Sequence, residues 1–120
     1  MKNVFALLSL LFFFSCSTPL PSLENIDTTR WKDDRNGCKG DRKEMISAIR
    51  EQREKLLTLK EMQIVQLLGR ADGNELFERN QKFYTYNLTP GKNCGVQDSV
   101  AVQLEIRFNA MGIAKEVQVN

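Results

Sequence analysis

The chain has 120 residues, with 17 Lys and Arg, 15 Asp and Glu, three Cys and no His, and its formal net charge is +2. This length fits one small domain, the absence of His excludes chemistry that needs an imidazole, and the near-balanced charge gives no field that favours nucleic acid as a partner. The odd number of cysteines needs a separate explanation.

The first sixteen residues predict a secretion and anchoring signal. Lys2 is followed by an almost unbroken apolar run, residues 4–14, which is shorter than the roughly 20 residues that span a bilayer. The run ends at Ser15-Cys16, and a small residue followed by Cys at this point resembles a bacterial lipoprotein signal. The resemblance implies cleavage before Cys16 and a lipid on Cys16. The alternatives are a plain secretory signal cleaved near residues 17–18, or an uncleaved anchor.

An extended tether is predicted over residues 16–27, because Pro19 and Pro21 stand there among small polar residues. The folded domain is therefore expected over residues 28–120.

The two remaining cysteines predict a disulfide. Secretion would place Cys38 and Cys94 in an oxidising compartment, where pairing is the default, and two buried free thiols are the alternative. A structural zinc site is not expected, because two cysteines without His do not supply four ligands.

Two helices are expected in the first half of the domain. One begins at Asp41, which forms an Asp-x-x-Glu variant of the capping box with Glu44. It continues without Gly or Pro and places apolar side chains on one face, at Met45, Ile49 and Leu56 among others. The second helix covers residues 61–68, with Thr58 as a candidate N-cap and Gly69 as the residue that ends it.

Three strands are expected in the second half. After a loop over residues 70–74, residues 82–88 are rich in aromatic and β-forming side chains. Residues 99–108 alternate apolar and polar side chains, with five inward positions from Val100 to Phe108, and residues 113–119 return after a tight turn. The predicted fold is therefore α+β, with two helices packed on one face of a three-stranded antiparallel sheet.

One motif resembles a known family. Leu67, Leu68, Gly69 and Asp72 stand as Leu-Leu-Gly-x-x-Asp at the end of the second helix, after an entry segment that begins at Trp31. The motif is similar to that of the SmpA/OmlA (BamE-like) family of small outer-membrane lipoproteins, although Ala71 stands where that family usually has Pro. The resemblance implies an ααβββ domain held on the periplasmic side of the outer membrane. It further implies binding to an envelope protein, with the β-barrel assembly machinery as one candidate partner.

A second family leaves an alternative function open. The same order of helices and strands resembles repeats of β-lactamase-inhibitor-like proteins, which implies an inhibitor or ligand-binding lipoprotein.

The residue after the predicted lipidated Cys16 favours the outer membrane over the inner membrane. This residue is Ser17, whereas inner-membrane retention in many Gram-negative bacteria uses Asp at this position.

The candidate partner-binding residues are aromatic. Trp31, Tyr84 and Tyr86 are proposed for contact with a partner, and packing within the domain is the alternative for each of them. The acidic residues near the basic ones in the entry segment are interpreted as helix caps and local ion pairs. No nucleophile elbow or phosphate-binding loop occurs, so the sequence predicts neither an enzyme, a metal, a cofactor nor a small-molecule substrate.

Overall fold

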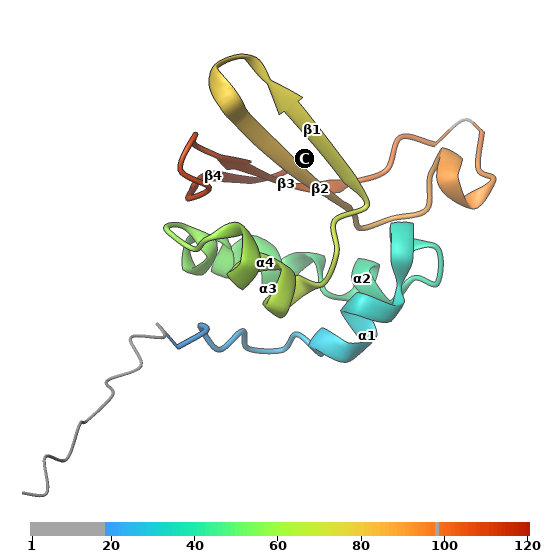
Figure 1. Cartoon of the computed structure of the whole chain (residues 1–120). Helices are drawn as coiled ribbons and strands as arrows, with labels where there is room; N and C mark the ends of the chain where they lie inside the picture. Colours follow the sequence, from blue (N-terminus) through green and yellow to red (C-terminus); the bar gives the residue numbers. More distant parts are fainter. Residues whose placement is uncertain (1–18, 98) are drawn as a thin grey trace, which may run out of the picture.

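The computed structural model describes residues 19–97 and 99–120, and the predicted signal and Cys16 lie outside this part of the chain. A layer of short helices lies on one face of a four-stranded antiparallel sheet with the strand order β1-β2-β3-β4 (Figure 1). The α+β class and the placement of the helices on one face are confirmed. The number of strands is four rather than three.

The helical layer contains more and shorter helices than the sequence predicts. Its elements are α1 (Thr28–Asp33), η1 (Arg35–Gly37), α2 (Asp41–Glu44), α3 (Ile46–Gln52), η2 (Arg53–Leu56) and α4 (Glu61–Leu68). The predicted first helix is broken at Met45, whose N–H donates to the Arg42 carbonyl at 2.9 Å in a tightened turn. Positions 42, 45 and 49 are buried on both sides of this break, so apolar spacing alone does not reveal it.

Helix ends use different residues from those predicted. Asp27 caps α1 by accepting hydrogen bonds from the N–H groups of Thr29 and Arg30. Asp41 and Glu44 do not form a capping box, because Gly40 is the N-cap of α2 and Asp41 is already its first helical residue. Both carboxylates bind the Arg30 guanidinium instead.

Helix α4 begins two residues later than a Thr58 N-cap would require. The N–H of Lys60 donates to Oε1 of Gln63 at 2.9 Å, while the N–H of Thr58 donates to the carbonyl of Ala114 at 2.9 Å. The helix ends at Gly69 as predicted. Gly69 has φ of 78°, and a Cβ there would lie 2.8 Å from Cγ of Lys32, so both conformation and space favour glycine.

The sheet consists of β1 (Gly73–Phe77), β2 (Gln81–Asn87), β3 (Gln103–Phe108) and β4 (Ala114–Val119). Strand β1 replaces part of the predicted loop, and four of its five residues are exposed, so it lacks the apolar alternation that marks a buried strand. Strand β3 begins at Gln103 instead of residue 99. Val100, predicted to point inward, is 95% exposed in the loop that precedes the strand.

The core lies between the helical layer and the sheet. It is formed by buried side chains from both layers, chiefly Trp31, Met45, Ile49, Leu56, Ile64, Leu67, Leu68, Tyr86, Leu88, Leu104, Ile106 and Phe108. Leu104, Ile106 and Phe108 of β3 therefore face inward as the alternation predicts. Burial of these side chains at about 1.5–3 kcal/mol each provides the main stabilisation of the domain.

The predicted tether is attached to the domain before it reaches α1. The carbonyl of Ser22 accepts a hydrogen bond from Nζ of Lys55 at 3.1 Å. Glu24 exchanges two hydrogen bonds with the Gln52 side chain, at 2.6 and 2.7 Å, and Leu23 and Ile26 pack against the core. Residues 22–26, called the strap below, therefore belong to the folded domain rather than to a flexible linker.

Candidate functional site

A groove runs between helix α4 and the hairpin formed by β1 and β2. Tyr84 of β2 stands opposite Asn74 of β1, so both side chains lie on the same face of the hairpin. Val65 approaches from α4. Two adjoining hollows of about 350 and 370 Å³ have Val65 and Tyr84 in common and together make up this groove. Tyr84 is the one predicted partner-binding residue that lines it.

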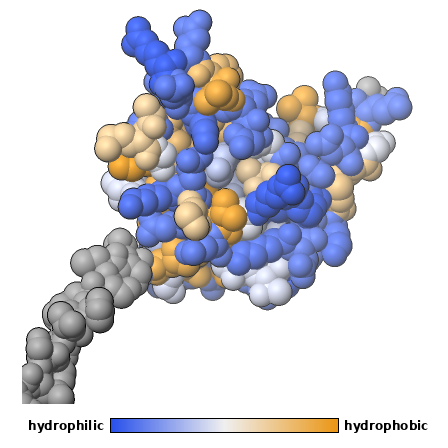
Figure 2. Space-filling model, in the orientation of Figure 1, coloured by the Kyte–Doolittle hydropathy of each residue, from blue (hydrophilic) through white to orange (hydrophobic). Residues whose placement is uncertain are grey.

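Exposed apolar side chains occur on both elements that border the groove. Met62 on α4 lines the groove and is 75% exposed, and Leu76 on β1 is 67% exposed. Leu76 stands opposite Lys82, which places it on the same face of the hairpin as Tyr84. Figure 2 shows apolar patches among hydrophilic surface on the side of the molecule that carries α4 and the hairpin. Such a surface can accept apolar side chains of another protein.

Charged groups close the groove at both ends. At one end Glu61 accepts a hydrogen bond from the Tyr84 hydroxyl at 3.1 Å and lies 3.3 Å from Nζ of Lys82. Burial, and then the charge of Glu61, raises the pKa of Tyr84 above its ordinary value. At the other end Arg35 and Arg70 line the hollow. The groove therefore combines an apolar middle with donors and acceptors at its ends.

A buried polar cluster fixes the base of the hairpin relative to the helices. Nη1 of Arg42 donates to Oδ2 of Asp72 at 2.6 Å and to the Asn87 carbonyl at 3.1 Å. Asp72 also accepts from the N–H groups of Asn36 and Asn87, at 3.1 and 2.7 Å. The side chains of Arg42 and Asp72 are both essentially inaccessible to solvent. We call Asp34, Asn36, Arg42, Asp72 and Asn87 the polar node.

The remaining contacts of Arg42 connect the polar node to α1. Its side-chain Nε donates to the Trp31 carbonyl at 2.9 Å, and its backbone N–H donates to Oδ2 of the buried Asp34 at 2.9 Å. The guanidinium carbon lies 5.3 Å from the Trp31 ring centroid and 5.8 Å from that of Tyr86. Stacking on two aromatic rings stabilises a cation that is removed from water. Arg42 thus joins α1, α2, β2 and the segment before β1.

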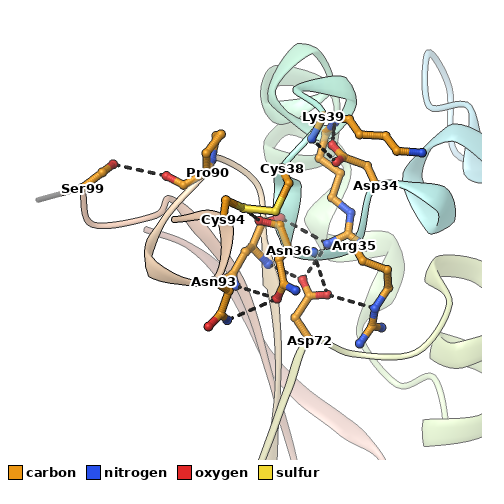
Figure 3. Close-up of a disulfide and its surroundings, with 12 residues drawn as sticks. Asp34, Arg35, Asn36, Cys38, Lys39, Asp72, Pro90, Asn93, Cys94 and Ser99 are labelled. Carbon is orange, nitrogen blue, oxygen red and sulfur yellow. Dashed lines mark hydrogen bonds and ion pairs between the residues drawn. A yellow bond between two sulfur atoms is a disulfide. The ribbon is translucent and has the colours of Figure 1, made fainter. Parts of the chain in front are cut away.

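The predicted disulfide is present and lies beside the polar node. Cys38 and Cys94 are bonded, which links the helical entry segment to the loop between β2 and β3 (Figure 3). Asn36 connects the two features, because its side-chain oxygen accepts from Nδ2 of Asn93 while its N–H binds Asp72. Gly37 has φ of 67°, and a Cβ there would lie 2.7 Å from the Asn87 carbonyl, so only glycine fits between them.

Two of the three predicted contact residues are unavailable to a partner. Trp31 and Tyr86 are fully buried in the core, so packing is their role and their interpretation as surface anchors is wrong. Leu67 and Leu68 are buried as well. Gly69 ends α4, and Asp72 binds Arg42 in the polar node. The Leu-Leu-Gly-x-x-Asp motif is therefore a structural element of this domain.

Sequence reasoning missed the central role of Arg42 and Asp34. Both were interpreted as members of a local set of caps and ion pairs, and Asp34 does accept local hydrogen bonds from the N–H groups of Lys39 and Arg42. The Arg42 guanidinium, however, binds Asp72, thirty positions away. Their only sequence signal was a place in the entry segment that carries the family resemblance.

Replacing Tyr86 with Phe should lower the free energy of unfolding by about 1 kcal/mol, because the Tyr86 hydroxyl donates to the Gly69 carbonyl at 2.7 Å. Burial raises the pKa of Tyr86 above its ordinary value. As the pH rises above about 10, the Tyr86 hydroxyl therefore ionises in the unfolded state before it does so in the folded state, and the free energy of unfolding falls. Urea unfolding between neutral and alkaline pH measures both effects. A Tyr86→Phe variant with the same alkaline loss as the wild type would contradict this assignment.

The chain matches no protein-family model, no curated protein and no solved structure. Within residues 19–97 and 99–120, no helix is long and apolar enough to cross a membrane. In the same part of the chain, no group of three His, Cys, Asp or Glu side chains could hold a metal ion. The predicted signal sequence, the disulfide and the groove are the features that bear on function.

Proposed function

We propose that the mature chain is a protein-binding module, anchored by a lipid on Cys16 to the periplasmic side of the outer membrane of a Gram-negative bacterium. It would assist an envelope assembly, and the machinery that inserts β-barrel proteins is the first candidate. The lipoprotein-like signal at residues 1–16 and the Cys38–Cys94 disulfide support an extracytoplasmic location. The absence of His from the chain and of any recognisable catalytic motif favours binding over catalysis.

The observation that carries this proposal is the groove between α4 and the hairpin. Met62 and Val65 leave apolar surface in water along it, and Leu76 adds exposed apolar surface on the same face of the hairpin as Tyr84. Such surface costs free energy unless a partner covers it. The polar node and the disulfide hold the base of the groove, so little ordering is needed on binding. The charged ends suit a short segment of another protein that presents an apolar side chain between polar groups.

Replacing Met62 with Glu should weaken binding of the partner about tenfold or more, because a carboxylate would have to be buried against apolar surface. Met111→Glu is the matched control. Met111 is 81% exposed in the turn before β4 and does not line the groove. The measurement is the yield of each crosslinked envelope protein recovered with the lipidated protein from intact cells, quantified by mass spectrometry.

Equal loss of the same partner in both variants would contradict a role for the groove. Recovery of no outer-membrane protein with the wild type would count against the proposed function as a whole. A soluble hydrolase as the Met62-dependent partner would instead support the inhibitor-like alternative, which uses the same groove for a different class of protein.

A further inference from the structure

The strap crosses the helical layer on the side away from the sheet, and the β1–β2 hairpin projects from the opposite side of the molecule (Figure 1). Its contacts are specific. Gln52 binds both the N–H and the carbonyl of Glu24, and Lys55 binds the carbonyl of Ser22. Leu23 and Ile26 add apolar contacts with the core. The chain is therefore fixed to α3 and η2 from residue 22 onward.

This attachment shortens the stretch of free chain between the predicted lipid on Cys16 and the domain, which we call the leash. Six residue steps separate Cys16 from Ser22, and a fully extended chain spans at most about 3.6 Å per residue, or roughly 20 Å. A tether that stayed free as far as Asp27 would have eleven steps and reach almost 40 Å. The strap thus halves the distance by which the domain can leave the membrane surface.

We propose that the strap orients the domain on the lipid surface, so that α3 and η2 face the membrane while the hairpin and the groove it borders face away from it. This inference rests on the lipid anchor of the proposed function. The exposed charges of α3 and η2 are nearly balanced, with Arg50, Arg53 and Lys55 beside Glu51 and Glu54. Leash length, and not attraction to anionic headgroups, therefore sets the orientation.

The test uses the full lipidated protein in vesicles of phosphatidylethanolamine and phosphatidylglycerol. A fraction of the phosphatidylethanolamine carries a diazirine on its headgroup, and photolysis labels protein surface close to the membrane. Peptide mapping should find several times more adducts on residues 19–24 and 46–56 than on residues 73–81 of the hairpin. Because the leash is covalent, high salt should leave this ratio unchanged.

Two variants separate the strap from the rest of the fold. A flexible Gly-Ser segment inserted between Thr18 and Pro19 lengthens the leash without touching the strap, and Gln52→Ala combined with Lys55→Ala removes the side-chain hydrogen bonds to Ser22 and Glu24. Both should spread the adducts toward the hairpin. Gln66→Ala is the control, since the hydrogen bond at Gln66 uses its backbone carbonyl, and it should retain the wild-type pattern.

An even distribution of adducts on the lipidated wild type, or a bias that high salt abolishes, would overturn the orientation while leaving the anchor intact. An unchanged bias after the Gly-Ser insertion would overturn it as well, because leash length would then be irrelevant. The intact mass of the mature protein reports the lipid on Cys16 separately. A mature chain without that lipid would remove the anchor, and with it both the proposed attachment and the orientation.

Discussion

Replacing Arg42 with Ala should lower the free energy of unfolding by about 3–5 kcal/mol, the range expected when one partner of a buried ion pair is removed. The change removes the closer cation of the inaccessible Asp72 carboxylate and leaves only the half-exposed Arg35, whose Nε lies 3.7 Å away. It also removes the hydrogen bonds to the Trp31 and Asn87 carbonyls and the stacking on two aromatic rings. The urea midpoint of the oxidised protein, followed by the fluorescence of Trp31, measures the loss.

Arg107→Ala is the matched control for this experiment. Arg107 pairs with Glu116 at 3.0 Å, but both side chains are partly exposed on the outer face of the sheet. Water screens such a pair, so its removal should cost less than about 1 kcal/mol. Similar losses for the two variants would show that Arg42 is no more important than a surface cation, and the assignment of the polar node as the central anchor would be wrong.

Local signals account for the parts of the fold that the sequence predicted correctly. Apolar alternation from Leu104 to Phe108 identifies the central strand because that strand buries one face. The end of α4 follows from Gly69, whose conformation is a property of one residue and its neighbours. The disulfide followed from elimination, since only two cysteines remain once Cys16 is assigned to the anchor.

Long-range contacts account for the parts that the sequence did not reveal. Strand β1 is held by pairing with β2, and its exposed side chains carry no period of their own. The strap is held by Lys55, which the helical pattern assigns to the exposed face, and by Gln52, which that pattern assigns to the same face as Met45 and Ile49. Tyr86 is of a residue type that is common at interfaces, and only the packing of the helices against β2 shows that it belongs to the core. The groove itself depends on the position of β1 and was therefore not predictable.

Removing the disulfide should also destabilise the domain strongly. Replacing Cys38 and Cys94 together with Ser should cost about 2–4 kcal/mol, because the bond closes a loop across 56 positions and restricts the unfolded chain. The loop contains α2, α3, α4, β1 and β2, so most of the domain lies within it. Urea unfolding of the double variant, and of the wild type with and without reductant, gives two independent measurements.

The loss on breaking the disulfide should not be independent of the loss on removing Arg42. Asn36 lies two residues before Cys38, binds Asp72 through its N–H and accepts from Asn93 next to Cys94. Breaking the disulfide frees the Asn93 side of this connection and loosens the position from which Asn36 holds Asp72. The combined variant should therefore lose less stability than the sum of the two separate losses, by about 0.5 kcal/mol or more. Strictly additive losses would show that the disulfide and the polar node stabilise the domain separately, and that Asn36 does not couple them.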